Sequence, residues 1–293
     1  MHLLAALLVV IVNYNVENLF HPAHDSLKDD IEWTADGDRH WSYTRYYRKV
    51  DNIARVLTNI GEWDGVDIVG LQEVENALCV KRLCYTLRRG EYDFVHYESP
   101  DKRGIDVALL YKKARIDTIR TRAVCVPLGA ETTRDILYVC AAIDKKDTLH
   151  CFVCHMPSQK GGAAESQWKR DQAKRVLQNA IDSVLQTDQD ARIIVMGDMN
   201  DAPKDDLNGL TNRMTGLQSK GQGTHKYQGR WTCLDQFYTS SALDSLSTVR
   251  IYDAEWIQEP DEKYLGLKPK RTYNGFHYQN GYSDHLPIVM NLQ

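Results

Sequence analysis

The chain has 293 residues, of which 43% are hydrophobic, a length and composition that suit one large domain with a substantial core. Its formal net charge is -4 and its sequence pI is about 6.2, so it lacks the overall basic bias that a dedicated duplex-DNA-binding domain usually carries. No repeat or low-complexity segment interrupts the sequence, and we therefore expect residues 1–293 to form a single domain.

The first predicted element is an apolar strand near the N-terminus. The apolar run over residues 3–12 is too short to span a bilayer, and the two residues before it include no Lys or Arg, which a signal peptide would supply. We therefore expect a core strand over residues 7–14. A signal or anchor remnant is the alternative interpretation of the same run.

Further apolar runs, rich in Val and Ile and bounded by polar residues or Gly, predict more buried strands. They cover residues 68–71, 107–111, 136–143, 149–155, 193–196 and 288–292. Helical spacing of apolar residues predicts amphipathic helices over 43–60 and 165–185. The last third of the chain is richer in loops, and the two long ones, 203–229 and 258–281, are expected to be functional.

The seven cysteines are an odd number, and most of them lie inside apolar runs, where Cys behaves as a small hydrophobe. Cys151 and Cys154 form a C-x-x-C pattern within the predicted strand 149–155. Positions three apart on a strand point to opposite faces, so this pair is not expected to act as a redox or zinc site. Reduced, structural thiols slightly favour a cytoplasmic location over export.

Polar side chains collect where the predicted strands begin or end. They are Asn15, Glu17, Gln72, Glu73, Asp106, His155, Ser158, Asp198, Asn200, Asp235, Ser283, Asp284 and His285. Taken singly, each of them is more often a solvated loop residue, a turn former or a structural histidine. If the strand ends converge on one sheet edge, however, these residues form one pocket.

Hydrolysis of a phosphate ester needs these residue types. Carboxylate and amide oxygens suit Mg²⁺, which also contacts phosphate oxygens. A histidine fixed by a carboxylate can take up or donate a proton near neutral pH. No Cys or His cluster has the spacing of zinc ligands, so the sequence favours Mg²⁺ over Zn²⁺ as the native metal.

Three motifs, LQE at 71–73, GDMN at 197–200 and SDH at 283–285, occur in this order along nearly the whole chain. Together they resemble the endonuclease/exonuclease/phosphatase superfamily, whose members are similar to deoxyribonuclease I, and other stretches resemble uncharacterised bacterial members. The resemblance implies an α/β fold: a four-layer α/β/β/α sandwich of two packed mixed sheets flanked by helices. It places the site at one edge of the two sheets.

The resemblance implies a metal site made of carboxylates and an amide. Glu73 matches the principal metal-binding glutamate, and Glu17 stands where the family has an acidic residue after an Asn. Asp284 matches a further metal-side carboxylate. Asn15 matches a residue that orients the metal ligands.

The resemblance also implies which residues carry the catalysis. Asp198 matches the residue that aligns or deprotonates the attacking water. His285 matches the histidine that contacts the scissile phosphate, with Asp235 as its carboxylate partner. His155 matches the second histidine of the deoxyribonuclease-like branch, and Asp106 resembles its carboxylate partner.

The residues expected around the phosphate are Asn200, Arg170, Arg103 and Ser158. Asn200 matches a residue that orients the phosphate, and Arg170 falls where several family members carry a phosphate-contacting Arg. Arg103, beside Gly104, is a similar candidate. Several aromatic residues near the motif loops form either a wall for the substrate or anchors for the loops. They are Tyr227, Trp231, Tyr273, Phe276, His277 and Tyr278.

These residues predict a Mg²⁺-dependent phosphoesterase that hydrolyses phosphodiester bonds, with Mn²⁺ as a substitute metal and nucleic acid as a candidate substrate. A nuclease of the deoxyribonuclease I-like type is the first interpretation. A phosphatase or a phosphodiesterase for lipids or small molecules is the second. A non-catalytic binding module is the third, and the complete set of motif residues disfavours it. No transmembrane segment and no protein partner is indicated, and a monomer is the default expectation.

Overall fold

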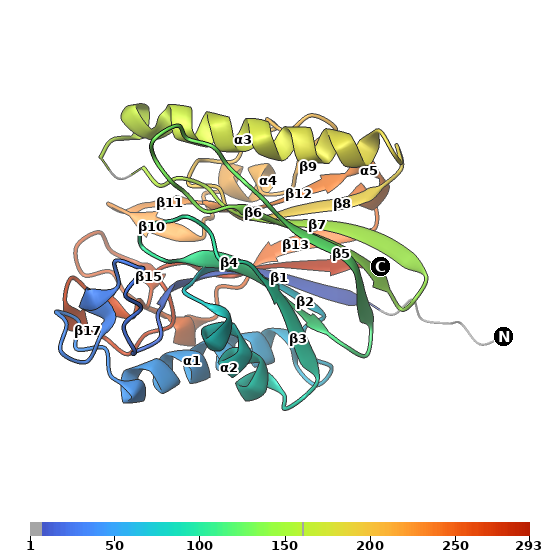
Figure 1. The fold of residues 1–293 in the computed structure, drawn as a ribbon. Coiled ribbons are helices and arrows are strands. Elements are labelled where there is room, and N and C mark those ends of the chain that lie inside the picture. Colours follow the sequence, from blue (N-terminus) through green and yellow to red (C-terminus); the bar gives the residue numbers. More distant parts are fainter. Residues whose placement is uncertain (1–7, 160) are drawn as a thin grey trace.

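Two six-stranded mixed sheets pack face to face in the computed structural model, which describes residues 8–159 and 161–293 (Figure 1). The first sheet has the strand order β13-β18-β1-β2-β4-β3. Its strands are β1 (Val9–Leu19), β2 (Ile68–Val74), β3 (Tyr92–His96), β4 (Asp106–Lys112), β13 (Ser247–Ile251) and β18 (Ile288–Leu292). The second sheet has the order β5-β6-β7-β8-β12-β9. Its strands are β5 (Ile116–Val124), β6 (Ile136–Ile143), β7 (Asp147–His155), β8 (Arg192–Asp198), β9 (Leu210–Asn212) and β12 (Asp235–Ser240).

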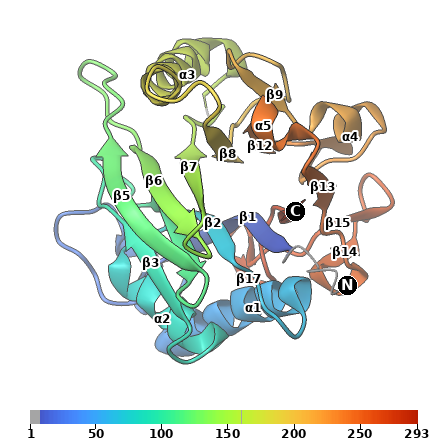
Figure 2. The ribbon, with the colours of Figure 1, turned by 90° about the vertical axis from the view of Figure 1, so that its right-hand side faces the viewer.

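Helices cover the outer face of each sheet, which completes the four layers (Figures 1 and 2). α1 (Tyr43–Gly61) and α2 (Ala77–Leu87) lie on the first sheet, and α3 (Ala163–Leu185) lies on the second. Three clusters of buried apolar side chains result, one under α1 and α2, one between the sheets and one under α3. The predicted α/β/β/α sandwich is confirmed. No helix within the described ranges is long and apolar enough to cross a membrane.

The predicted helices at 43–60 and 165–185 correspond to α1 and α3. In α1 the side chains on the predicted stripe are buried, and Ser42 caps the N-terminus by accepting a hydrogen bond from the amide of Arg45. Cys151 and Cys154 point to opposite faces of β7, the first into the core between the sheets and the second under α3. The prediction that these two side chains point to opposite faces of a strand is confirmed, and both cysteines are free.

Two expectations need adjustment. The N-terminal strand begins at Val9 and continues to Leu19, so Asn15 and Glu17 lie within it and not after it. Residues 3–7 of the apolar run 3–12 fall outside the described part of the chain. The long segments 203–229 and 258–281 are also not continuous loops. They contain the helix α4 (Thr215–Ser219), the hairpins β10 (His225–Tyr227) with β11 (Arg230–Thr232), β14 (Gln258–Pro260) with β15 (Leu267–Pro269), and β16 (Tyr273–Asn274) with β17 (His277–Tyr278).

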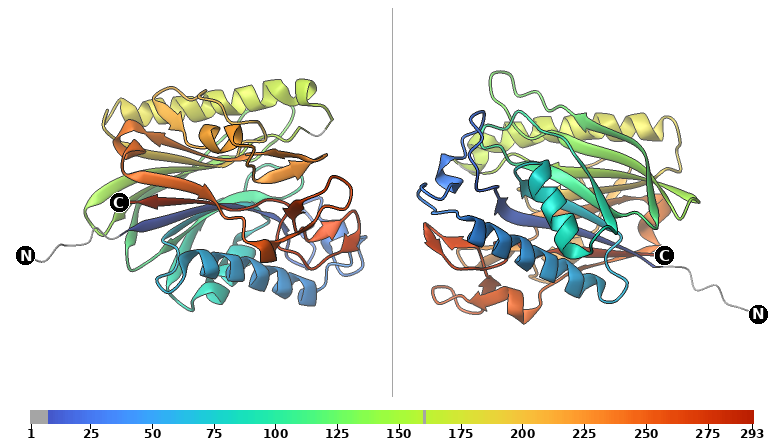
Figure 3. Two further views of the ribbon diagram at one scale, coloured as in Figure 1. Left: turned by 180° about the vertical axis from the view of Figure 1, so that it is seen from behind. Right: turned by 60° about the horizontal axis from the view of Figure 1, so that its bottom comes forward.

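The topology brings the motif residues to one end of the sandwich. β1 runs parallel to β2, and β7 runs parallel to β8, so the C-terminal ends of these four strands point the same way. β4, β12 and β18 run antiparallel to them and begin at that same end. The small hairpins gather there too, on the left in Figure 1, whereas the C-terminus lies at the opposite end (Figure 3).

Candidate active site

Two irregularities in the central strands of the first sheet shape the site. The register between β1 and β2 shifts between Asn15 and Leu19, and the register between β2 and β4 shifts between Gln72 and Val74. Within these bulges Glu17 (φ 52°) and Glu73 (φ 65°) adopt left-handed backbone conformations, which are uncommon for residues other than Gly. Bulges re-aim side chains, and strained backbone of this kind clusters at functional sites.

Glu17 and Glu73 are held on the two neighbouring bulges, and Asp284, in the loop before β18, is joined to Glu17 through Arg271. The amide of Asn18 donates to Glu73 Oε2 at 2.9 Å, and the amide of Thr272 donates to Glu17 Oε2 at 2.6 Å. Arg271 links the group, since its Nη2 donates to Asp284 Oδ2 and its Nε lies 3.8 Å from Glu17 Oε1. Glu17 is 6% exposed, so its charge is held largely out of water.

The electrostatics of this group fit a divalent cation. Burial, together with the nearby charge of Asp284, raises the pKa of Glu17 to about 7. Burial lowers the pKa of Lys49 to about 8, and this ammonium lies 3.9 Å from Glu17 Oε2. Glu17 is buried, whereas Glu73 and Asp284 are partly buried. Together with the amide of Asn15, their oxygens are the kind of ligand set that Mg²⁺ or Mn²⁺ takes.

Asp198 occupies the end of β8 and is 2% exposed. Its Oδ2 accepts a hydrogen bond from Asn15 Nδ2 at 3.1 Å, and its Oδ1 accepts one from the amide of Asn200 at 2.8 Å. The preceding Gly197 is required by close packing, because a Cβ there would lie 2.0 Å from the carbonyl oxygen of Cys154. Burial raises the pKa of Asp198 to about 6, which makes it a suitable proton acceptor.

Two imidazoles flank Asp198. The Nε2 of His155 lies 3.7 Å from Asp198 Oδ2 and 3.8 Å from Glu73 Oε1. The Nε2 of His285 lies 3.9 Å from the same Asp198 oxygen, and its Nδ1 contacts Asp235 Oδ2 at 2.7 Å. The structure thus brings Glu73, Asp198 and both histidines into one cluster, with Asp235 fixing the orientation of His285.

The two imidazoles have opposite electrostatic environments. Burial lowers the pKa of His155 well below its usual range, and the charges of Arg134 and Arg103 act in the same direction. Burial also acts against the charge of His285, but Asp235 and then Asp198 outweigh it and raise the pKa of His285 well above the usual value. A pair of titratable groups pushed apart in this way is a frequent feature of acid–base sites.

Asp106 lies at the beginning of β4 and is 1% exposed. The amide of Ser99 (3.1 Å) and its hydroxyl donate to Asp106 Oδ1, and the imidazole 3.6 Å from Oδ2 is that of His96. Asp106 Oδ2 and His155 Nδ1 are both buried without a hydrogen-bond partner among the described residues. The hydrogen bond between Asp106 and His155 implied by the resemblance is therefore not formed, and a catalytic role for Asp106 stays a prediction.

The residues expected to contact phosphate differ in their placement. Arg170 on α3 is only 1% exposed, and its guanidinium donates to Ser166 Oγ (2.8 Å) and to the carbonyl of Pro157 (3.4 Å). Through the carbonyl of Pro157 it therefore supports the loop that follows β7. Arg103 is more open and donates to Asn18 Oδ1 at 2.7 Å, next to Glu73, and Ser158 is exposed in the loop after His155.

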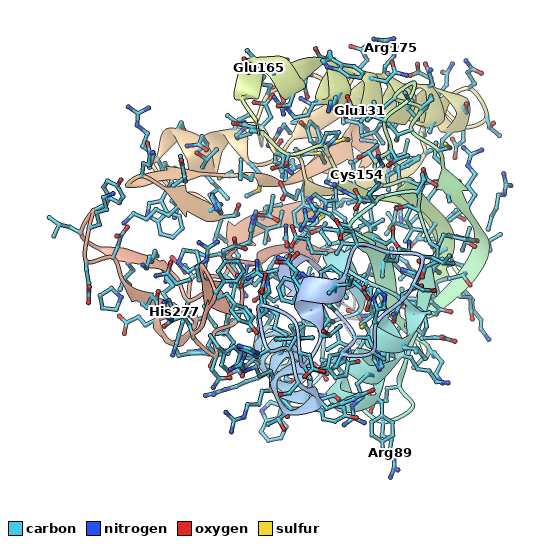
Figure 4. All side chains as sticks on the ribbon, turned by 60° about the vertical axis from the view of Figure 1, so that its left-hand side comes forward. Arg89, Glu131, Cys154, Glu165, Arg175 and His277 are labelled. Atoms are coloured by element: carbon cyan, nitrogen blue, oxygen red, sulfur yellow. The ribbon has the colours of Figure 1, made fainter. Side chains whose placement is uncertain are left out.

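The aromatic residues split between the two expected roles. Tyr273 is buried against Trp33 and Trp41, so it anchors its loop. Tyr227, by contrast, is 68% exposed at the end of β10, the strand that carries His225, and Phe276 is 60% exposed in the turn between β16 and β17. Figure 4 shows His277 on the outer hairpin, well away from the strand ends around Cys154.

Three residues at the site were not singled out in the sequence as site residues: His225, Lys49 and Arg271. His225 lies on β10, with its ring centroid 4.9 Å from that of His285. Lys49 Nζ donates to the carbonyl of Tyr282, just before the SDH motif, at 2.6 Å. Nothing in a single sequence marks these residues, because their positions depend on how helix α1 and two loops pack against β1 and β18.

Known proteins show the same overall architecture. The chain matches the model of the Endonuclease/Exonuclease/phosphatase family over residues 10–293. Its fold is similar to that of truncated TDP2 from Caenorhabditis elegans, at 16% identity and a TM-score of 0.62, over 98% of both chains. It is also similar to the human Nocturnin catalytic domain with bound sulfate, at 16% identity and a TM-score of 0.60, over 98% of this chain and 94% of that chain. A mannosyl-6-phosphatase from Bacteroides thetaiotaomicron is 15% identical, with a TM-score of 0.60, over 97% of this chain and 99% of that chain. No curated protein sequence matches the chain.

Proposed function

The chain belongs to the endonuclease/exonuclease/phosphatase family and is a metal-dependent phosphoric ester hydrolase, and from this premise we propose that it hydrolyses phosphodiester bonds of nucleic acid with Mg²⁺. The observation that supports the proposal most is the placement of Asp198 between the imidazoles of His155 and His285, beside a group of three carboxylates. This arrangement combines a proton acceptor, two imidazole donors and a candidate cation site within a few ångströms.

Glu73, Glu17 and Asp284, with Asn15, are the residues that would hold the metal. Their oxygens are the ligands that Mg²⁺ prefers, and Mn²⁺ is a suitable substitute. Bound there, the cation would supply positive charge that offsets the charge on the phosphoryl oxygens. In our proposal Lys49 and Arg271 position the carboxylates from the protein side, Lys49 through Glu17 and Arg271 through Asp284.

Asp198 is proposed to align the attacking water and to accept its proton. Asn15 and Asn200 donate hydrogen bonds to its two oxygens, so the carboxylate is held in one orientation. Protonated His285, supported by Asp235, then donates a hydrogen bond to a phosphoryl oxygen and stabilises the developing charge. His155, on the other side of Asp198, donates to the phosphate from the opposite direction.

Exposed groups around the cluster support nucleic acid as the substrate. The exposed aromatic ring of Tyr227 can stack on bases, whatever their sequence. Arg103 and Arg271 add positive charge on the metal side of the cluster, and the side chain of Arg271 is 39% exposed. The net charge of -4 disfavours tight binding of long duplex DNA and favours short or single-stranded substrates.

The same net charge keeps a second candidate open, a phosphatase or a phosphodiesterase for small molecules or lipids. A substrate panel separates the two. It consists of plasmid DNA, RNA, inositol phosphates and bis-p-nitrophenyl phosphate, each with Mg²⁺, with Mn²⁺ and with EDTA. We expect metal-dependent cleavage of the nucleic acids and of the diester, whereas release of phosphate from inositol phosphates alone would favour the second candidate.

Variants link the activity to the cluster. Replacement of Glu73, Asp198 or His285 by Ala is expected to lower turnover by about 10²-fold or more while the protein still folds. Turnover close to that of the wild-type protein in all three variants would rule out this site.

A further inference from the structure

Two imidazoles and a carboxylate converge beside the proposed Mg²⁺ site. The ligand atoms of His225, Asp284 and His285 all lie within 4.8 Å of one another. We propose that these residues form a binding site for a transition-metal ion such as Zn²⁺, adjoining the carboxylate site and sharing Asp284 with it.

The backbone holds the two imidazoles next to each other. His225 and His285 form an isolated antiparallel bridge, and the amide of Leu286 donates to the carbonyl of Thr224 at 2.7 Å. The two rings are 4.9 Å apart between centroids, with an interplanar angle of 40°. The hairpin β10–β11 therefore fixes His225 next to the SDH motif, with its ligand atom within 4.8 Å of those of Asp284 and His285.

The groups behind the three residues favour ligation. The Nδ1 of His285 contacts Asp235 Oδ2 at 2.7 Å, which leaves Nε2 as the nitrogen available to an ion. A carboxylate behind a histidine in this way orients the ring and raises its basicity as a metal ligand. Arg271 contacts Asp284 through Oδ2, so the other carboxylate oxygen is the one offered to the ion.

The donor set selects the type of metal. Two imidazole nitrogens and one carboxylate oxygen match the three protein ligands of open Zn²⁺ sites, whereas Mg²⁺ takes oxygen ligands almost exclusively. Imidazole ligands also suit Cu²⁺ and Ni²⁺. Occupation of this site uses Nε2 of His285, the atom that the proposed function assigns to the phosphate. If that function holds, the transition-metal ion inhibits the Mg²⁺-dependent reaction.

The site can be tested by direct binding, without any substrate. Untagged protein in excess Mg²⁺ is titrated with Zn²⁺ by calorimetry, and its Co²⁺ complex is examined by absorption spectroscopy. The wild-type protein is expected to bind one ion, with a tetrahedral Co²⁺ spectrum that lacks thiolate charge-transfer bands. His225→Gln should weaken Zn²⁺ binding by about 100-fold or more, since the loss of even a residue that supports a ligand costs about 10- to 100-fold.

His277→Gln is the matched control, because His277 lies on the outer hairpin (Figure 4). It should bind Zn²⁺ like the wild-type protein. His96→Gln tests the other candidate group in the described ranges, His96 with Glu98 and Asp106. Loss of binding in His96→Gln with full binding in His225→Gln would overturn the proposal. X-ray absorption of the wild-type Zn²⁺ complex is a test that needs no variant, and a spectrum without imidazole scattering would also overturn it.

The failure of the site and the failure of the proposed function give different results. Absence of Zn²⁺ binding in a protein that hydrolyses phosphodiesters with Mg²⁺ contradicts the site alone. Binding of Zn²⁺ that depends on His225 but leaves Mg²⁺-dependent hydrolysis unchanged supports the site and contradicts the role of His285 in the reaction.

Discussion

The exchange Asp235→Asn tests the pair of Asp235 and His285 without changing the shape of either side chain. Asp235 is 0% exposed, and its Oδ2 lies 2.7 Å from Nδ1 of His285. An Asn at this position can still accept a hydrogen bond from the ring, so the principal loss is the negative charge. Burial lowers the pKa of His285, and Asp235, Asp198 and Asp284 raise it, so loss of the Asp235 charge should lower the pKa of the ring and reduce its protonated fraction.

The size of the effect follows from the burial of the pair. Removal of one partner of a buried charge pair costs about 3–5 kcal/mol. Applied to a transition state in which the imidazolium faces the phosphoryl oxygens, this loss corresponds to a decrease in kcat of roughly 10²- to 10⁴-fold. The free energy of unfolding should fall by only about 1 kcal/mol, because the Asn side chain still accepts the hydrogen bond of the ring.

The assay is the rate of bis-p-nitrophenyl phosphate hydrolysis at saturating Mg²⁺, combined with urea denaturation of the same preparations. Asp30→Asn is the matched control, since Asp30 is 1% exposed and pairs with Nδ1 of His24 outside the cluster. The control should lose stability and keep its kcat. If Asp235→Asn keeps the wild-type kcat, or loses activity only in proportion to unfolded protein, the assignment of His285 and Asp235 is refuted.

Other consequences concern the metal, the loop after β7 and the pH dependence of stability. Glu73→Gln removes one negative charge from the proposed metal site, so it should raise the Mg²⁺ concentration needed for half-maximal activity by at least about tenfold. The urea midpoint should change little. A Mg²⁺ titration equal to that of the wild-type protein would contradict this prediction. Arg170→Lys should lower the free energy of unfolding by about 1–3 kcal/mol, because the buried hydrogen bonds from the guanidinium to Ser166 and Pro157 are lost. A large rise in KM at unchanged stability would instead indicate that Arg170 contacts the phosphate directly. Burial raises the pKa of Glu75 from its ordinary value of 4.5 to about 8, so the folded state binds the proton more tightly and stability should fall as the pH rises from about 4.5 to 8. In Glu75→Gln the decrease in the urea midpoint between pH 5 and pH 8 should be smaller than in the wild-type protein, and an equal decrease would show that other groups cause it.

Much of the fold followed from apolar patterns in the sequence. Buried strands and the two long amphipathic helices were predicted close to their observed bounds, because continuous burial and helical spacing leave strong local signals. Helix α2 was missed: it is short, and its N-terminus depends on Asn76 accepting hydrogen bonds from the amides of Leu78 and Cys79. The hairpin strands β10, β11 and β14 to β17 were missed for a similar reason, since two or three residues carry no periodicity; the longer β12 and β13 were missed as well.

The location of the candidate site was also predictable in part. Polar residues at the ends of parallel strands had to meet at one edge, and Glu73, Asp198 and His285 do lie together there. The bulges that aim Glu17 and Glu73 were not predictable, because a left-handed backbone at Glu leaves no mark in composition. The position of Arg170, buried against the loop after β7, also depends on tertiary packing. The family resemblance alone suggested that this residue contacts phosphate.

Anomalous diffraction from crystals of the protein soaked in Mn²⁺ tests the proposed cation site without any substrate. We expect the strongest anomalous peak to lie among the carboxylates of Glu17, Glu73 and Asp284, next to Asp198. A strongest peak elsewhere, with no density between these three side chains, would contradict the central claim that they share a divalent cation.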